Sequence, residues 1–214
     1  IGDAGNNKLE GRDGDDTLIG GEGFDDLRGG SGDDTLDGSA GSAFMVGGSG
    51  DDTLIGNPGV GGVNLSTGSA SYHDASSGIV ADLSTGIVED GDGGTDTLID
   101  INFISGSDHN DAIFDSDGDD NLEGNAGDDV LVSGAGQDFL TGDEFGGSVT
   151  GSDTFVFTSK DGSTRNLKTS EGFYGSTVND YTAGEDRIVF EGMQGISYTG
   201  RVFEMVNGDP FGST

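Results

Sequence analysis

The sequence predicts an all-β protein built from stacked repeats, and three observations lead to this fold class. Residues 1–63 divide without a gap into seven units of nine residues, each with Gly at its second and fifth places and an apolar residue at its ninth. The 214 residues include 44 glycines and no cysteine. Only 30% of the residues are hydrophobic, and 41 acidic against 8 basic side chains give a formal charge of −33. Units this short cannot bury an apolar face alone, so they must stack on one another.

Each unit predicts one loop and one short strand. In EGRDGDDTL (10–18), the glycines let the loop bend sharply and bring carbonyl oxygens together, and the Asp at the seventh place adds a carboxylate. The next residues, such as Thr17-Leu18-Ile19, form a strand whose middle side chain points inward. The inward residues would then form one internal ladder: Leu9, Leu18, Leu27, Leu36, Met45, Leu54 and Val63.

The charge excludes some partners and requires a counterion. Nucleic acid and anionic membrane surfaces would be repelled, and no apolar run approaches the roughly 18 residues of a membrane span. A chain with few hydrophobic residues and this much like charge does not collapse unaided. Because cysteine is absent, disulfides and thiolate metal sites are excluded. A hard cation held by oxygen ligands is the remaining means of neutralisation.

The nine-residue frame is lost after residue 63 and returns at residue 90. It is present in DGDGGTDTL (90–98) and SGSDHNDAI (105–113), continues to Leu140, and ends with an interrupted unit at SDTF (152–155). The intervening and final segments lack the frame. We therefore expect four parts: a first array (1–63), an insert (64–89), a second array (90–155) and a C-terminal capping segment (156–214).

These units resemble the RTX, or hemolysin-type, repeats of secreted bacterial proteins, whose nonapeptide G-G-x-G-x-D-x-U-x forms a calcium-bound parallel β-roll. The match is specific in RGGSGDDTL (28–36). SDTFVF (152–157) and NDYTAGEDRIVF (179–190) are similar to the segment that closes the roll in serralysin-type proteases and in alginate epimerase repeat modules. The resemblance implies two calcium-bound parallel β-rolls with an irregular insert and antiparallel capping strands.

In this family two nonapeptides make one turn, and each calcium ion lies between a loop and the loop two units further on. The even units of the first array then place three acids on one edge, and the opposite edge keeps only Asp25. Asp96 is in frame but is followed by six extra residues (99–104). The predicted metal ligands are Asp16, Asp25, Asp34, Asp52, Asp96, Asp111, Asp120, Asp129, Asp138 and Asp153, with Gly11, Gly14, Gly29, Gly32, Gly47, Gly50, Gly124 and Gly127. About four to seven Ca²⁺ ions are expected from pairs of this type.

The fifth unit, DGSAGSAFM (37–45), keeps its nine residues but has Ala43 where other units have Asp. Its strand places Phe44 and Val46 on the outer face. We expect protein from the insert to cover these two apolar side chains.

The resemblance implies a non-catalytic, calcium-binding module of a secreted or cell-surface bacterial protein, which folds on calcium outside the cell and supports type I secretion. Calcium is the expected cofactor, the type I secretion apparatus and a polysaccharide are further expected partners, and the chain is expected to be a monomer. Two alternatives stay open: a substrate-holding module of an exoenzyme (alginate epimerase or serralysin-like protease), and an adhesin extender near a cell-anchored end. No catalytic residues are predicted, and a chain that begins inside a repeat is expected to be part of a longer protein.

Three motifs also suggest other functions. DSDGDDNLEG (115–124) imitates the start of an EF-hand loop, but Asp120 stands where that loop requires Gly and the flanks are not helical. The Gly-rich runs could cradle phosphate at a helix N-terminus, but Asp pairs flank them and strands follow. His73 beside Asp74 could belong to a Ser-His-Asp hydrolase, but a polar loop is the simpler interpretation.

Overall fold

The structure is a computed structural model, and it describes residues 1–57, 59, 68–143, 151–158, 177–178, 186–191, 196–198 and 203–205. All regular secondary structure in these residues is β-strand, arranged in two large sheets and one small one. No helix that could cross a membrane occurs in the described part of the chain.

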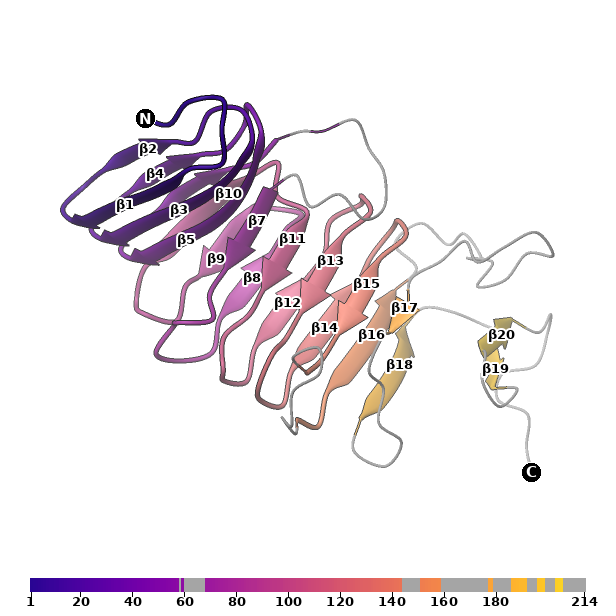
Figure 1. Ribbon diagram of the computed structural model, residues 1–214. Coiled ribbons are helices and arrows are strands. Elements are labelled where there is room, and N and C mark those ends of the chain that lie inside the picture. The colour runs from indigo at the N-terminus through magenta and orange to yellow at the C-terminus, as the bar shows by residue number, and fades with distance from the viewer. Residues whose placement is uncertain are drawn as a thin grey trace.

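The two large sheets, here sheet A and sheet B, form the two walls of a roll, and the chain passes repeatedly from one to the other (Figure 1). Sheet A has the strand order β1 (Lys8–Asp13), β3 (Phe24–Ser31), β5 (Ser42–Ser49), β7 (Gly68–Ser71), β11 (Phe103–Ser105), β13 (Asn121–Glu123), β15 (Phe139–Thr141) and β17 (Thr177–Val178). Sheet B has the order β18 (Arg187–Glu191), β16 (Thr154–Thr158), β14 (Val130–Ser133), β12 (Ala112–Phe114), β8 (Val80–Asp82), β9 (Ile87–Glu89), β10 (Thr95–Ile99), β6 (Thr53–Ile55), β4 (Thr35–Asp37) and β2 (Thr17–Ile19). Strands β19 (Ile196–Tyr198) and β20 (Phe203–Met205) form a separate antiparallel pair.

The core is a pair of apolar ladders, one from each sheet. In sheet B, Leu18 pairs with Leu36 and Leu36 pairs with Leu54, because two nine-residue units make one turn. In sheet A, Leu27 pairs in the same way with Leu9 and Met45. The inward residues from Leu18 to Leu54 are buried, which confirms the predicted ladder there; Leu9 is half-buried at its end, and Val63 lies outside the described residues.

The ladders continue through the second array. Ile104, Leu122 and Leu140 follow one another in sheet A, and Ile113, Leu131 and Phe155 do so in sheet B. All six side chains are 0% exposed. The predicted all-β parallel β-roll is therefore the fold of this chain.

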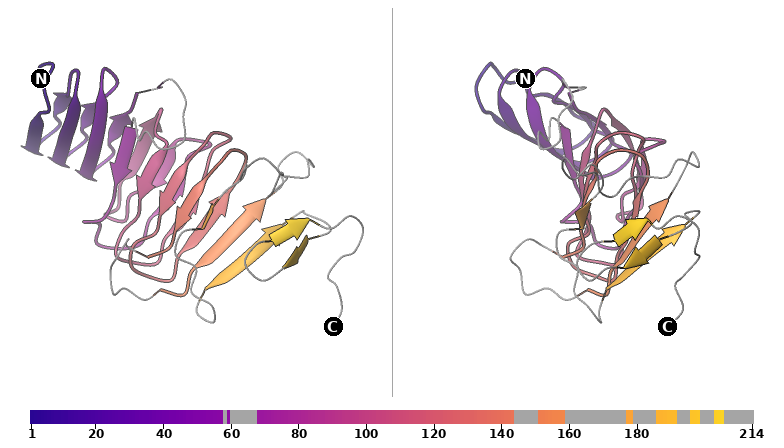
Figure 2. Two further views of the ribbon diagram at one scale, coloured as in Figure 1. Left: turned by 45° about the vertical axis from the view of Figure 1, so that its right-hand side comes forward. Right: turned by 90° about the vertical axis from the view of Figure 1, so that its right-hand side faces the viewer.

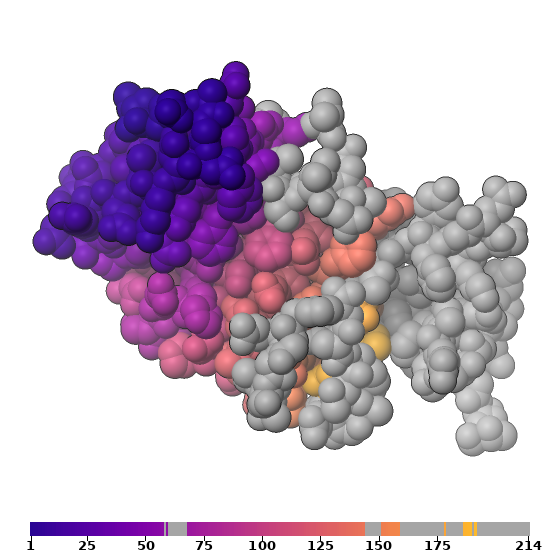
Figure 3. All heavy atoms as spheres, in the orientation of Figure 1, coloured from indigo at the N-terminus to yellow at the C-terminus, as the bar shows by residue number. Residues whose placement is uncertain are grey.

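The two arrays belong to one roll rather than to two rolls with an irregular insert between them. Strand β7, from the predicted insert, pairs with β5 on one side and β11 on the other, so that Ala70 lies between Met45 and Ile104. The atoms of the two arrays adjoin each other directly (Figure 3). The insert lacks the glycine and Asp frame, but a parallel rung requires only a strand with an inward apolar residue, and Ala70 and Ala81 meet this condition at 0% exposure.

The insert adds one strand, β7, to sheet A and two strands, β8 and β9, to sheet B. Strand β9 is antiparallel to both β8 and β10, and β8 then pairs in parallel with β12. Sheet B therefore has three strands between β6 and β12, whereas sheet A has two between β5 and β13. Because one wall is wider at this point, the strands before and after it are tilted relative to each other (Figures 1 and 2).

Two further expectations concern the outer face and the C-terminal end. Phe44 and Val46 are half-buried. The Arg28 guanidinium, from the first array, lies 5.9 Å from the centroid of the Phe44 ring. The insert contributes the neighbouring strand β7, in which Ser69 pairs with Phe44. At the end of the roll, β18 pairs with β16 in parallel, so the expectation of an antiparallel cap was wrong for this strand. The parallel stacking extends beyond the last unit with a recognisable frame.

Candidate metal centres

Aspartates at the seventh place of successive units form a mostly buried column along each edge of the roll, and we call these seventh-place aspartates together the inner column. In most of them, one carboxylate oxygen accepts a backbone hydrogen bond from the rung before. The N–H of Asp16 donates to Oδ1 of Asp34, and the N–H of Asp34 donates to Oδ1 of Asp52, both at 2.7 Å. In the second array the N–H of Asp111 donates to Oδ1 of Asp129 at 2.8 Å. These bonds hold the carboxylates in a fixed orientation.

In several of these carboxylates the second oxygen, Oδ2, has no comparable partner. Among the residues that the structure describes, none donates a hydrogen bond to Oδ2 of Asp25, Asp34, Asp52 or Asp129. These side chains are 0 to 1% exposed. An ionised oxygen left without a partner in a buried site costs far more free energy than a satisfied one. The Oδ2 atoms are therefore placed to bind a cation.

Backbone carbonyl oxygens lie next to the Oδ2 atoms, and the glycine at the second place makes this possible. A β-carbon on Gly11 would lie 2.6 Å from the carbonyl oxygen of Gly29 and 2.7 Å from Oδ2 of Asp16. A β-carbon on Gly124 would collide with Oδ2 of Asp129 and lie 2.7 Å from the carbonyl oxygen of Gly142. Carboxylate and carbonyl oxygens from two successive turns thus converge, and such oxygens are the ligands that Ca²⁺ prefers.

The second-place and fifth-place glycines are required for different reasons. Gly14, Gly32, Gly50 and Gly127 occupy the fifth place and have φ angles of 101°, 119°, 126° and 129°, which side chains disfavour. Gly11, Gly29, Gly47 and Gly124 occupy the second place, where a side chain would strike the Asp of the same unit. The sequence analysis gave both sets one role, and the structure separates them.

We expect Gly124→Ala to damage the roll and Gly118→Ala to be tolerated. The added methyl group at residue 124 meets Oδ2 of Asp129 and the Gly142 carbonyl, whereas at exposed Gly118 the nearest atom is Oγ of Ser116, at 3.3 Å. Overpacking of this kind costs about 1–3 kcal/mol. Urea unfolding at saturating calcium, with bound calcium measured in parallel, compares the two variants. Equal stability and calcium content in both would contradict the assignment of this space to the metal site.

The inner column is electrostatically unfavourable without a cation. Burial, followed by repulsion from Asp34 and other carboxylates, raises the pKa of Asp52 to about 6. Burial, with repulsion from Asp111 and Asp153, raises the pKa of Asp129 to about 8. The same main cause, burial, raises the pKa of Asp34 and of Asp111. Ionisation of these carboxyl groups is therefore less favourable in the folded chain than in a free Asp unless positive charge is supplied.

A second column of carboxylates lies outside the first, at the sixth place of the units, and the sequence analysis missed it. These side chains accept backbone hydrogen bonds from the rung after them, opposite to the direction in the inner column. Oδ1 of Asp15 accepts the N–H of Asp33, and Oδ1 of Asp33 accepts the N–H of Asp51, both at 3.0 Å. The repeated Asp-Asp dipeptides were the available signal, because each dipeptide ties its rung to both neighbours.

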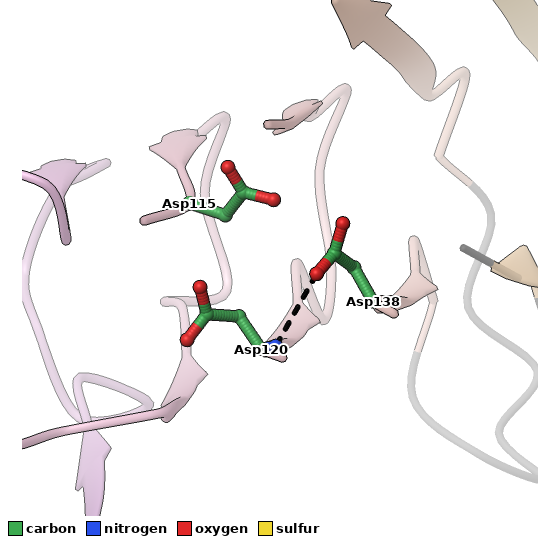
Figure 4. Close-up of side chains that lie close together, drawn as sticks. All are labelled: Asp115, Asp120 and Asp138. Atoms are coloured by element: carbon green, nitrogen blue, oxygen red, sulfur yellow. Dashed lines mark hydrogen bonds between the residues drawn. The ribbon is translucent and has the colours of Figure 1, made fainter. Parts of the chain in front are cut away.

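Three buried carboxylates meet on the other edge of the second array (Figure 4). Oxygen atoms of Asp115, Asp120 and Asp138 lie within 4.8 Å of one another, and these side chains are at most 4% exposed. Asp115 occupies the second place of its unit, where most units have Gly. Burial, with repulsion from Asp138, raises the pKa of Asp115 to about 9, and no described residue donates to its Oδ2. Sequence reasoning predicted Asp120 and Asp138 but missed Asp115.

Serine hydroxyls donate to the other two carboxylates of this cluster. Oγ of Ser116 donates to Oδ2 of Asp120, and Oγ of Ser133 donates to Oδ2 of Asp138, both at 2.6 Å. The segment 115–124 follows β12 and contains β13, with no helix on either side among the described residues, in agreement with the preference for the in-frame repeat over an EF-hand. The cluster is a part of the roll that brings three carboxylates and two hydroxyls together.

The remaining predicted ligands differ in their surroundings. Asp25 accepts the N–H of Asn7 at 2.9 Å, and the methyl group of Ala43 fills the corresponding space one turn later. Asp111 accepts hydrogen bonds from both the N–H and the hydroxyl of Ser107, at 2.7 Å each. Asp153 donates its N–H to Oδ1 of Asp186 at 3.1 Å, which extends the column to a residue that the sequence analysis did not predict.

Asp96 and His73 require separate comment. Asp96 is fully buried and accepts the N–H of Asp52 at 2.9 Å, like its counterparts, but its Oδ2 also accepts the hydroxyl of Tyr72 at 2.9 Å. Nδ1 of His73 lies 3.2 Å from Asp108, and both side chains are more than half exposed. The partner of His73 is thus Asp108 and not Asp74, the neighbour considered in the sequence.

Comparison with known proteins supports calcium as the cation. A family profile described as the RTX calcium-binding nonapeptide repeat, in four copies, matches residues 1–27, 10–45, 19–54, 37–60 and 102–144. These segments contain all the predicted aspartate ligands except Asp96 and Asp153. No curated protein matches the chain.

Proposed function

Because residues 1–60 and 102–144 belong to the RTX calcium-binding nonapeptide repeats, we propose that the roll is a non-catalytic calcium-binding module of a secreted or cell-surface bacterial protein. The module folds on calcium outside the cell and thereby supports type I secretion. The observation that carries this proposal is the recurring buried Oδ2 of the inner column, to which no described residue donates a hydrogen bond.

The residues present fit calcium ions between successive turns. The inner-column aspartates supply carboxylate oxygens, and the second-place glycines supply carbonyl oxygens. A bound ion would offset the repulsion along the column and give each Oδ2 a partner. From the number of such pairs, about four to seven ions would be held per chain.

The charge of the chain connects calcium binding with export. A formal charge of −33 keeps the calcium-free chain extended through self-repulsion, which suits passage through a secretion channel. Extracellular calcium modules bind at roughly 0.1 to 1 mM, far above cytosolic calcium. Metal binding then supplies the folding free energy only after export, as in other domains that are folded with metal and unfolded without it.

Calcium counting on the variants Asp34→Asn and Asp33→Asn tests this function. The adjacent residues carry the same charge, and Asn retains an Oδ1 atom that can accept the backbone N–H bonded there in each case. Only Asp34 belongs to the inner column. We expect the Asp34 variant to bind about one calcium ion fewer per chain and the Asp33 variant to bind as many as the wild type. A wild-type chain that binds no calcium at millimolar concentration would refute the function, and equal losses in both variants would refute the inner column as the site.

A further inference from the structure

The turn formed by residues 90–96 is the place where the roll departs from the repeat pattern most clearly. It joins β9 to β10 within sheet B, yet it stacks on the turn of residues 47–52 as an ordinary turn would. The N–H of Asp52 donates to Oδ1 of Asp96 at 2.9 Å, and the N–H of Thr95 donates to Oδ1 of Asp51 at 2.8 Å. Asp96 therefore occupies the inner column, where the repeat pattern predicts a calcium ligand.

The hydroxyl of Tyr72 satisfies the oxygen that a cation would otherwise bind. It lies 2.9 Å from Oδ2 of Asp96, and Tyr72 is 5% exposed. The residue directly follows β7, and its own N–H donates to the carbonyl oxygen of Ser105 at 2.9 Å, which fixes its backbone. Burial and the neighbouring carboxylates raise the pKa of Tyr72 well above its ordinary value, so the hydroxyl keeps its proton and remains a donor. Both oxygens of Asp96 thus have protein donors.

Asp90, in the same turn, shows the opposite arrangement. Its Oδ1 accepts hydrogen bonds from the N–H groups of Asp92, Gly93 and Gly94, at 2.9, 2.9 and 2.8 Å. Its Oδ2 has no donor within the described part of the chain, and the side chain is 1% exposed. Asp90 thus presents one oxygen fixed by the backbone and one buried oxygen without a partner, as Asp34 and Asp52 do.

The unpartnered oxygen of Asp90 lies close to the preceding turn. A β-carbon on Gly94 would lie 2.8 Å from Oδ2 of Asp90 and would collide with the carbonyl oxygen of Gly50. The approach to the Gly50 carbonyl is the usual one between fifth-place glycines of successive turns, as between Gly50 and Gly32, and the nearby Oδ2 of Asp90 is what distinguishes this turn. Asp90 also repels Asp52 electrostatically, and Oδ2 of Asp52 is likewise buried and without a described donor.

We propose that the calcium ion at this junction is bound by Asp52 and Asp90, with the Gly50 carbonyl beside them, and that Tyr72 takes the place of a cation at Asp96. The proposal rests on the calcium-binding function proposed above and assigns the ligands of one site. Tyr72 comes from the predicted insert, and Asp90 directly follows it. The insert and the turn that follows it therefore complete the last metal site of the first array, and Tyr72 ends the calcium column there.

The variants Asp90→Asn and Asp96→Asn distinguish this assignment from the repeat pattern. Asn at residue 90 can still accept the three N–H bonds through Oδ1, and Asn at residue 96 can still accept the N–H of Asp52. Calcium bound per folded chain is counted by native mass spectrometry at saturating calcium. We expect the Asp90 variant to bind one ion fewer and the Asp96 variant to keep the wild-type number. Loss of an ion from the Asp96 variant alone, or from neither variant, would overturn the proposal.

Tyr72→Phe provides a second test that does not depend on the folding of the Asp90 variant. Without the hydroxyl, Oδ2 of Asp96 becomes a buried oxygen like that of Asp34, and calcium should then be recruited to it. We expect the variant to show a larger increase in Tm on addition of calcium than the wild type. An equal loss of Tm at low and at saturating calcium would show that Tyr72 contributes only a hydrogen bond. Failure of the wild-type chain to bind any calcium would refute the calcium function itself, independently of these comparisons.

Discussion

Removal of calcium at neutral pH is expected to unfold the roll. At pH 7.5 in EDTA, we expect the far-UV circular dichroism signal of β-structure to be lost, and to return cooperatively as calcium is titrated back. The physical reason is that Asp34, Asp52 and Asp129 are each at most 1% exposed and have an Oδ2 atom that no described residue satisfies. Each ionised carboxylate must leave water on folding, and the formal charge of −33 adds general repulsion.

Two controls separate ligation from the screening of charge. Sodium chloride at matched ionic strength screens the repulsion, but monovalent Na⁺ binds carboxylate oxygens far more weakly than Ca²⁺, so it should not restore the β signal. Magnesium demands a small octahedral shell and gives up its water reluctantly, so it should act weakly at equal concentration. A β-rich spectrum that EDTA leaves unchanged would show that the apolar ladders hold the fold unaided, and would remove the physical basis for calcium-dependent folding outside the cell.

The regular half of the fold could be predicted because the period determines it. Once two units make one turn, Leu18, Leu36 and Leu54 must align, and each Asp of the inner column must lie one rung from the next. The same argument failed for β7, β8 and β9. Their inward residues, such as Ala70 and Ala81, occur without any glycine and Asp frame, and alternation over three or four residues is too short a signal to detect.

The least regular features of the metal sites depend on contacts across long stretches of sequence. Asp52 and Asp96 are 44 residues apart, yet they occupy adjacent rungs. The hydrogen bond between Tyr72 and Asp96 exists only because β7 enters sheet A while β10 enters sheet B. Asp115 could in principle have been identified from the sequence, because an Asp at a place where most units have Gly is visible when the units are aligned. Its function depends on Asp138, which only the folded chain brings near.

Acidification is expected to restore part of the roll when calcium is absent. The folded-state pKa is raised by burial to about 6 for Asp52 and about 8 for Asp129, from an ordinary value of 3.8. The folded chain therefore binds more protons than the unfolded chain between these values. Its free energy of unfolding must rise as the pH falls through the folded-state pKa values, and level off below the unfolded one. In EDTA, the β signal and Tm should increase from about pH 8 to about pH 5. A signal independent of pH would contradict this.

The variant Asp129→Asn should stabilise the roll without calcium and destabilise it with calcium. This reversal separates the effect of neutralising one buried carboxylate from that of a general loss of negative charge. Asn removes the charge, can still accept the N–H of Asp111, and directs an amide toward the region of the Gly142 carbonyl. In EDTA at neutral pH it should therefore be more stable than the wild type. At saturating calcium it should be less stable, because a ligand is lost. The exposed Asp128→Asn, with the same change of charge, should show neither effect to a comparable degree. Thermal unfolding of the two variants under both conditions measures this, and destabilisation of the Asp129 variant in EDTA would show that repulsion in the inner column does not limit folding.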